Sequence, residues 1–271
     1  MKKAFLPFLL HFLFIYSASL AAVVDTVDVY SASMKKTLKT VVIRPDNYGS
    51  AELPVVYLLH GYSGNHADWI KKAVGFQKAA DQYNVLIVCP DGGFSSWYWD
   101  SPVDKQSQYE TYISKELVAF VDGKYKTIKD KKGRAITGLS MGGHGALYLA
   151  FKHQDVFGAA GSMSGGVDIR PFPNNWDMAK RLGTYAQQPE RWEENTVINM
   201  LHLLTPNNLA IIIDCGTDDF FFRVNEKLHE QLLYRNIPHD YITRPGAHNW
   251  PYWTNAIQFQ MLFMSNFFSK K

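Results

Sequence analysis

The segment Gly138-Leu139-Ser140-Met141-Gly142 limits the fold of this chain more than any other, because of its two flanks. A strand-like run, residues 134–137, precedes it directly, and a helix-like run, residues 143–152, follows it. A serine between two such glycines on a sharp strand-to-helix turn has the pattern of a nucleophile elbow, where side chains at the glycine positions would collide with the turn. The pattern makes Ser140 the candidate nucleophile.

The chain downstream supplies the two partners that a nucleophilic serine needs. A neutral hydroxyl is a poor nucleophile, so it requires a base, and the base requires an acid that holds its tautomer. One strand-like run ends at Asp218-Asp219 and a later one ends at His248. Serine, acid and histidine in this order are typical of an α/β-hydrolase triad. Asp214 lies inside its strand, which leaves Asp218 or Asp219 as the acid and His248 as the base.

An upstream loop matches the place where such folds stabilise negative charge. The apolar run 54–59 ends in His60-Gly61-Tyr62-Ser63-Gly64. The equivalent loop offers one backbone N–H to an oxyanion hole, and the residue after the nucleophile offers the other. The expected donors are therefore the amides of Tyr62 and Met141. We expect His60 to fix the shape of this loop through hydrogen bonds and His144 to be a helix-surface or packing residue.

Five segments together resemble the esterase D-like branch of the α/β-hydrolases, across nearly the whole chain after the leader: 60–64, 96–102, 138–143, 215–220 and 246–253. That branch includes S-formylglutathione hydrolases, tributyrin esterases, feruloyl esterases of carbohydrate esterase family 1, and mycolyltransferases. The resemblance implies an α/β-hydrolase fold and serine-based ester chemistry without a cofactor. It also places the acid three residues after Gly216, at Asp219, in preference to Asp218.

The length of the chain and its first 21 residues predict how it is divided into a domain and a signal peptide. With 271 residues, 46% of them apolar, it can bury one large core, so residues 22–271 are expected to form a single domain. Lys2, Lys3, an apolar stretch at 4–16 and Ser19-Leu20-Ala21 predict a signal peptide over residues 1–21. The apolar stretch is too short to span a bilayer comfortably. A secreted or periplasmic enzyme without stable membrane insertion is therefore expected.

Charge and ligand spacing exclude several kinds of partner. The 28 basic and 25 acidic side chains nearly balance, and two of the basic ones lie in the leader, so nothing favours nucleic acid or an anionic membrane surface. There is no His-x-x-x-His or cysteine pair at metal-ligand spacing and no glycine-rich phosphate loop, so no metal or cofactor is expected. The strand order implied by the resemblance separates Cys89 from Cys215, so both should be buried free thiols.

Strands and helices alternate along the chain, which predicts a mostly parallel central sheet with helices on both faces. The expected strands are 23–29, 36–43, 55–59, 85–89, 135–137, 159–163, 209–214 and 241–243, and the expected helices are 75–83, 109–121, 143–151, 224–234 and 253–268. Between 165 and 208 the pattern breaks into a Pro- and Asn-rich insertion with short helices at 178–181 and 190–195. This insertion is expected to act as a small irregular cap at the substrate entrance.

Aromatic residues supply candidates for substrate binding. Trp97, Tyr98 and Trp99 are consecutive, and neighbours on an extended segment point to opposite sides, so at least one should face the cleft. Trp97, Trp99 and Trp250 are the candidate substrate-binding residues. Packing beneath a loop is the alternative for each of them.

These features favour an exported serine esterase that removes feruloyl or acetyl groups from carbohydrate esters, so the expected partner is a small-molecule or polysaccharide ester. Alternatives are a general short-chain esterase of the tributyrin type, an S-formylglutathione hydrolase-like thioesterase, and an acyltransferase in which a sugar hydroxyl replaces water. From another class, a non-catalytic carbohydrate-binding relative would not need Ser140, Asp219 and His248 together. The acyl group, the alcohol and the oligomeric state stay open.

Overall fold

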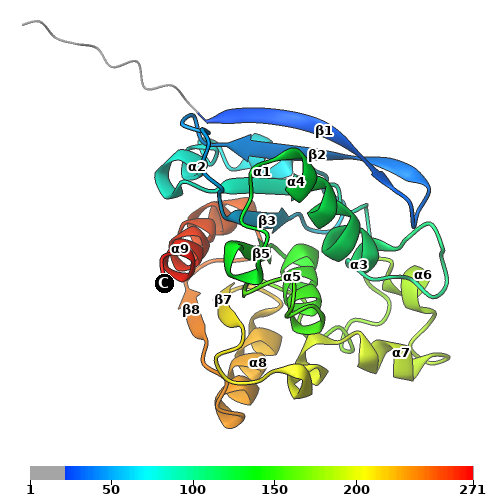
Figure 1. Cartoon of the computed structure of the whole chain (residues 1–271). Helices are drawn as coiled ribbons and strands as arrows, with labels where there is room; N and C mark the ends of the chain where they lie inside the picture. Colours follow the sequence, from blue (N-terminus) through cyan, green and yellow to red (C-terminus); the bar gives the residue numbers. More distant parts are fainter. Residues whose placement is uncertain (1–21, 271) are drawn as a thin grey trace, which may run out of the picture.

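A single eight-stranded sheet runs through the computed structural model, which describes residues 22–270 (Figure 1). Its order is β1-β2-β4-β3-β5-β6-β7-β8. β1 and β2 pair antiparallel, β2 pairs antiparallel with β4, and the other neighbours are parallel. The strands are β1 Val23–Ser31, β2 Lys36–Arg44, β3 Val55–Leu59, β4 Leu86–Pro90, β5 Arg134–Gly138, β6 Ala159–Met163, β7 Ala210–Gly216 and β8 Asp240–Arg244. The predicted mostly parallel sheet is confirmed, while the predicted signal peptide, residues 1–21, lies outside the described residues.

Helices cover both faces of the sheet, as expected, and each face has its own apolar core. One core includes Trp69 of α1, Ala79 of α2 and Ile257 of α9. The other includes residues of α4, α5 and α8, and Figure 1 shows α9 and α5 on opposite sides of the strands. The helices are α1 Asp68–Lys72, α2 Lys78–Tyr83, α3 Tyr109–Thr111, α4 Val118–Lys124, α5 Met141–Lys152, α6 Met178–Leu182, α7 Pro189–Glu194, α8 Phe222–Tyr234 and α9 Trp250–Phe268.

Two departures from the expected elements concern helices. α1 was not expected, because it has only five residues, three of them charged. The helix expected at 109–121 is interrupted, since a π-helical segment, Tyr112–Leu117, joins α3 to α4. The expected insertion is present between β6 and β7, where α6, α7 and two short 3₁₀ turns replace a regular crossover.

The register of the strands brings distant loops together at one edge of the sheet. Leu59 at the end of β3 pairs with Gly138 at the end of β5. Gly216 at the end of β7 likewise pairs with Arg244 at the end of β8. Because all four strands are parallel, the loops after them meet at their carboxyl ends, where open α/β sheets carry their sites.

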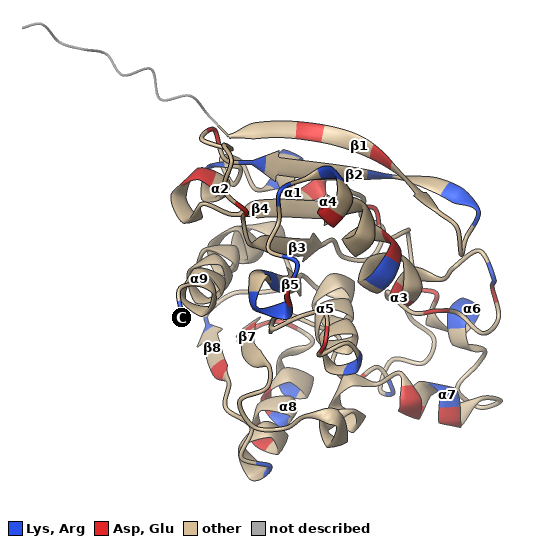
Figure 2. Cartoon of the chain, viewed as in Figure 1, with Lys and Arg blue, Asp and Glu red and all other residues tan. Residues whose placement is uncertain are grey.

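Lys, Arg, Asp and Glu residues are spread over the helices, strands and loops rather than gathered on one element (Figure 2). Cys89 and Cys215 are buried free thiols, as predicted, on strands that three others separate. Within residues 22–270, no helix is long and apolar enough to cross a membrane. In the same range, no group of three or more His, Cys, Asp or Glu side chains is placed to hold a metal ion.

Candidate active site

Ser140 occupies the sharp turn between β5 and α5. Its backbone has φ 55° and ψ −118°, a conformation that costs a non-glycine residue strain energy. The two glycines of the segment are required by close backbone approach. A Cβ on Gly142 would lie 2.6 Å from the carbonyl oxygen of His60, and one on Gly138 would lie 2.6 Å from the carbonyl oxygen of Gly142. The steric reason expected for the Gly-x-Ser-x-Gly pattern is thus present in the structure.

A continuous hydrogen-bonded chain joins the loops after β5, β7 and β8. Ser140 Oγ lies 2.9 Å from His248 Nε2. His248 Nδ1 lies 3.0 and 2.8 Å from the two carboxylate oxygens of Asp219. The structure therefore brings Ser140, His248 and Asp219 together. With the proton on Nδ1, the imidazole can accept the serine proton at Nε2 while the carboxylate holds its orientation.

The neighbouring acids are held elsewhere. Asp218 is exposed, and only its backbone N–H reaches the histidine loop, at the Gly246 carbonyl. Asp214 is buried inside β7, where its carboxylate binds Arg244 at 2.7 Å and the Tyr252 hydroxyl at 2.6 Å. These contacts tie β7 to β8 and to α9, beneath the loops that carry Asp219 and His248.

Aromatic rings surround the His248 imidazole. The ring of Phe220 lies 4.2 Å from it between centroids, and the rings of Trp253 and Phe221 meet it edge-on at 4.8 and 5.5 Å. Of these, Phe220 is half exposed, whereas Phe221 and Trp253 are buried. The packing restricts the imidazole to the plane that reaches both Ser140 and Asp219.

Two backbone amides beside Ser140 have no protein acceptor. Within residues 22–270, neither the N–H of Tyr62 nor that of Met141 donates to another protein group. Met141 is also the first residue of α5, a helix of 12 residues, so the positive end of the helix dipole lies next to Ser140. Unpaired amides in this position can stabilise an anionic oxygen.

Ser140 and His248 open into a cleft of about 360 Å³. Trp250 lines this cleft, and two aromatic residues that the sequence did not single out line it as well. Trp176 comes from the insertion and Phe220 directly follows Asp219, and their rings stack at 5.7 Å with 19° between the planes. The full lining is Gly61, Tyr62, Ser63, Gly64, Asp68, Lys72, Leu139, Ser140, Trp176, Phe220, His248, Trp250 and Trp253. A tryptophan directly after the Pro- and Asn-rich residues 171–175 was the available signal for Trp176.

The prediction that Trp97 or Trp99 faces the cleft is wrong. Their side chains are 1% and 0% exposed, and neither lines the cleft. The prediction assumed an extended segment, whereas Trp97 and Tyr98 adopt left-handed φ values of 54° and 62°. The turn directs both indoles inward, where their N–H groups bind the backbone oxygen of Trp176 and Nε2 of His144. The packing alternative is therefore correct for both tryptophans.

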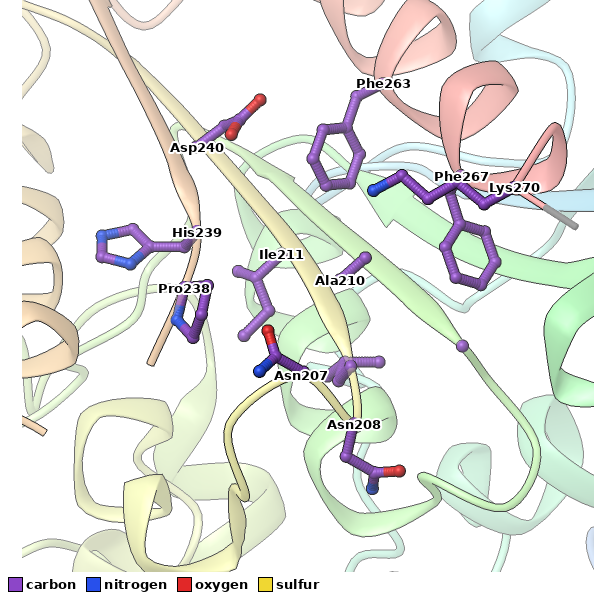
Figure 3. Close-up of a pocket in the computed structure, with 12 residues that line it drawn as sticks. Asn207, Asn208, Ala210, Ile211, Pro238, His239, Asp240, Phe263, Phe267 and Lys270 are labelled. Atoms are coloured by element: carbon purple, nitrogen blue, oxygen red, sulfur yellow. The ribbon is translucent and has the colours of Figure 1, made fainter. Parts of the chain in front are cut away.

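A second hollow of about 330 Å³ lies at the other end of the sheet (Figure 3). Its walls include Asn207 and Asn208 before β7, Asp240 at the start of β8, and Phe263 and Phe267 of α9. Because β7 and β8 are parallel and begin here, this hollow is on the opposite edge from Ser140. It contains no member of the Ser140–His248–Asp219 chain.

Comparisons with known proteins agree with this geometry. The family described as "Putative esterase" matches residues 31–264. An acetyl esterase of Caldicellulosiruptor saccharolyticus is 26% identical over 88% of this chain and 97% of its own length. Esterase Rv1288 of Mycobacterium tuberculosis is 33% identical over 76% of this chain, which spans about half of that longer protein (51%). A solved structure titled ferulic acid esterase is 25% identical and superimposes with a TM-score of 0.78, covering 92% of this chain and 99% of that one. The chain belongs to this esterase family, and the protein is a carboxylic ester hydrolase with the α/β-hydrolase fold.

Proposed function

We propose that the esterase works through an acyl-enzyme formed on Ser140. His248 takes the serine proton as Oγ attacks the ester carbonyl, and then gives it to the departing alcohol. Water activated by the same imidazole releases the acid and regenerates Ser140. Asp219 keeps the proton on Nδ1 and stabilises the imidazolium. The observation that carries this proposal is the pair of short contacts, 2.9 Å from Oγ to Nε2 and 2.8 Å from Nδ1 to the carboxylate.

The amides of Tyr62 and Met141 form the oxyanion hole in this proposal. Met141 directly follows Ser140, Tyr62 lines the same cleft as Ser140, and both amides lack a protein acceptor within residues 22–270. In the tetrahedral intermediate the former carbonyl oxygen carries negative charge, which these N–H groups and the amino end of α5 stabilise.

The proposed substrate is a carbohydrate ester with a feruloyl or acetyl group, which the exported enzyme would hydrolyse outside the cytoplasm. Its support is the aromatic lining of the cleft: the stacked pair Trp176 and Phe220, together with Trp250. Flat rings of this kind stack on a hydroxycinnamoyl ring or a sugar face. The names of two relatives, an acetyl esterase and a ferulic acid esterase, agree with this class. The sequence of residues 1–21 supports export.

Substitutions in the triad test the chemistry. Ser140→Ala and His248→Ala should each lower kcat for p-nitrophenyl acetate by several orders of magnitude, and the double variant should be little slower, because nucleophile and base act as one unit. Circular dichroism confirms that the variants are folded. Turnover near that of the wild type in either variant would refute the assignment.

A substrate series tests the ester class. The values of kcat/KM for methyl ferulate, acetylated xylan and tributyrin are compared between wild type, Phe220→Ala and Tyr234→Ala. Phe220→Ala should weaken use of the ferulate more than that of tributyrin, and Tyr234→Ala, which removes an exposed ring outside the cleft, should leave the relative use of the three substrates unchanged. A strong preference for tributyrin in every protein would instead favour the general short-chain esterase. Transfer of the acyl group to an added sugar in preference to water would favour the acyltransferase.

A further inference from the structure

The oxyanion loop, residues 60–64, contains a peptide unit whose orientation decides whether Tyr62 can donate. In a trans peptide the C=O and the following N–H point in opposite directions. The direction of the Tyr62 N–H is therefore fixed by the Gly61 carbonyl, which belongs to the same peptide plane. Glycine at position 61 offers little resistance to rotation of this plane, since it tolerates most backbone angles.

Two donors hold the Gly61 carbonyl. His60 Nδ1 lies 2.8 Å from its oxygen, and the N–H of Gly64 lies 3.1 Å from it. The other imidazole nitrogen of His60, Nε2, accepts the N–H of Gly92 at 2.8 Å. Because Nε2 accepts, the proton of the neutral ring is on Nδ1, where it donates to Gly61. Burial lowers the pKa of His60, which favours this neutral form.

The preceding peptide unit, His60–Gly61, is held by Tyr98. Its hydroxyl donates to the carbonyl oxygen of His60 at 2.9 Å. Tyr98 is fully buried, and glycines at 92 and 145 make room for its ring, since a Cβ at either position would lie 2.3 Å from a ring carbon. A side chain at position 142 would clash with this same carbonyl oxygen of His60. The hydroxyl of Tyr98 thus fixes the point where the oxyanion loop contacts the turn that carries Ser140.

We propose that His60 and Tyr98 are positioning residues of the oxyanion hole, and this inference rests on the proposed function. His60 holds the Gly61–Tyr62 peptide and Tyr98 holds the His60–Gly61 peptide, so that the Tyr62 N–H faces the developing oxyanion. Neither side chain lines the cleft. Their loss should weaken binding of the transition state and leave binding of the ground-state ester nearly unchanged.

The experiment compares kcat and KM for p-nitrophenyl acetate in matched variants. Removal of an oxyanion-hole donor costs about 10²–10³-fold in kcat, so His60→Ala should lower kcat by about 10²-fold at nearly constant KM. His60→Asn keeps an N–H near the position of Nδ1 and should recover part of the loss. Tyr98→Phe removes one hydrogen bond and should cost about tenfold. Tyr112→Phe is the control, because this buried hydroxyl contacts Thr40, outside the oxyanion loop.

Affinity for a boronic acid inhibitor separates positioning from general loosening of the fold. The tetrahedral boronate places an oxygen in the oxyanion hole, so its affinity should fall in parallel with kcat across the variants. Urea unfolding monitors stability, and Tyr98→Phe serves as the milder variant should His60→Ala fold poorly. Wild-type kcat and boronate affinity in folded Tyr98→Phe and His60 variants would overturn this inference alone, provided that Ser140→Ala is inactive. If Ser140→Ala keeps turnover, the proposed function fails and the inference falls with it.

Discussion

His144 makes the folded protein sensitive to acid in a definable pH range. The imidazole lies inside the core between α5 and the insertion, with Nδ1 3.0 Å from the Gly166 carbonyl oxygen and Nε2 accepting the indole N–H of Trp99 at 3.0 Å. An indole can only donate, so Nε2 carries no proton in the native state. Protonation there breaks this hydrogen bond and places a charge in the core. Burial lowers the pKa of His144 to about 4, although its hydrogen bond to Gly166 acts in the opposite direction.

The sign and size of the effect follow from this pKa. In the unfolded chain a histidine has a pKa near 6.5, so between about pH 6.5 and 4 unfolding takes up a proton at this residue. The contribution of His144 is complete above about pH 6.5 and is lost as the pH falls toward 4. A difference of roughly 2.5 in pKa corresponds to about 3 kcal/mol in the free energy of unfolding.

Urea unfolding followed by tryptophan fluorescence at several pH values measures this slope. Between about pH 4.5 and 6, replacing His144 by the non-titrating glutamine should reduce the slope of unfolding free energy by up to about 1.4 kcal/mol per pH unit. His202→Gln removes an exposed histidine and is the control. Because slopes are compared, any constant destabilisation of the variant cancels. Parallel curves for wild type and His144→Gln would refute the reasoning.

Three further predictions concern one partly buried glutamate and two residues near Ser140. For Glu110, hydrogen bonds from neighbouring side chains outweigh burial and lower the pKa to about 2, so its contribution to stability is complete above about pH 4.5 and is lost toward pH 2. Glu110→Gln should therefore flatten the dependence of the unfolding free energy on pH between those two pH values, which urea unfolding at several pH values measures. Gly142→Ala should lower kcat by about 10²-fold by displacing the His60 carbonyl, as kinetics on folded protein would show. Asp219→Asn should lower kcat up to about 10⁴-fold through the wrong imidazole tautomer, with Asp218→Asn much milder, and the reverse order would move the acid role to Asp218.

Most of the sheet could be predicted because its strands are short apolar runs between turn residues. β3 is fully buried on both faces, and a continuous Val-Val-Tyr-Leu-Leu run is what that environment requires. The position of Ser140 was equally predictable from the sequence, because close backbone contacts restrict residues 138 and 142 to glycine. Chain order then indicated His248, whose reach to Ser140 depends on β5, β7 and β8 being parallel.

The cleft walls were less accessible from sequence because they depend on long-range packing. The positions of Trp97 and Trp99 were predicted wrongly because the backbone is left-handed at Trp97 and Tyr98. Neither residue is a glycine or an asparagine, so nothing in the sequence indicated this turn. Trp176 reaches the cleft from an irregular insertion, at a residue that is itself left-handed with φ 50°. Local patterns carry no information on such a contact, which exists only after β6, β7 and the insertion have assembled.

The position of Phe220 links substrate range to catalytic rate. This residue forms part of the cleft wall, yet it directly follows Asp219 and its ring lies 4.2 Å from the imidazole of His248. A substitution that reshapes the wall here also releases the imidazole, so a lineage adapting to a new ester would lose speed as it changed selectivity at this position. Trp176, on the insertion, forms the other half of the stacked pair, and its ring meets Phe220 and Phe221 but not the His248 imidazole itself. Selection for new substrates, in nature or in the laboratory, should therefore succeed first at Trp176 and only later, with compensating changes, at Phe220.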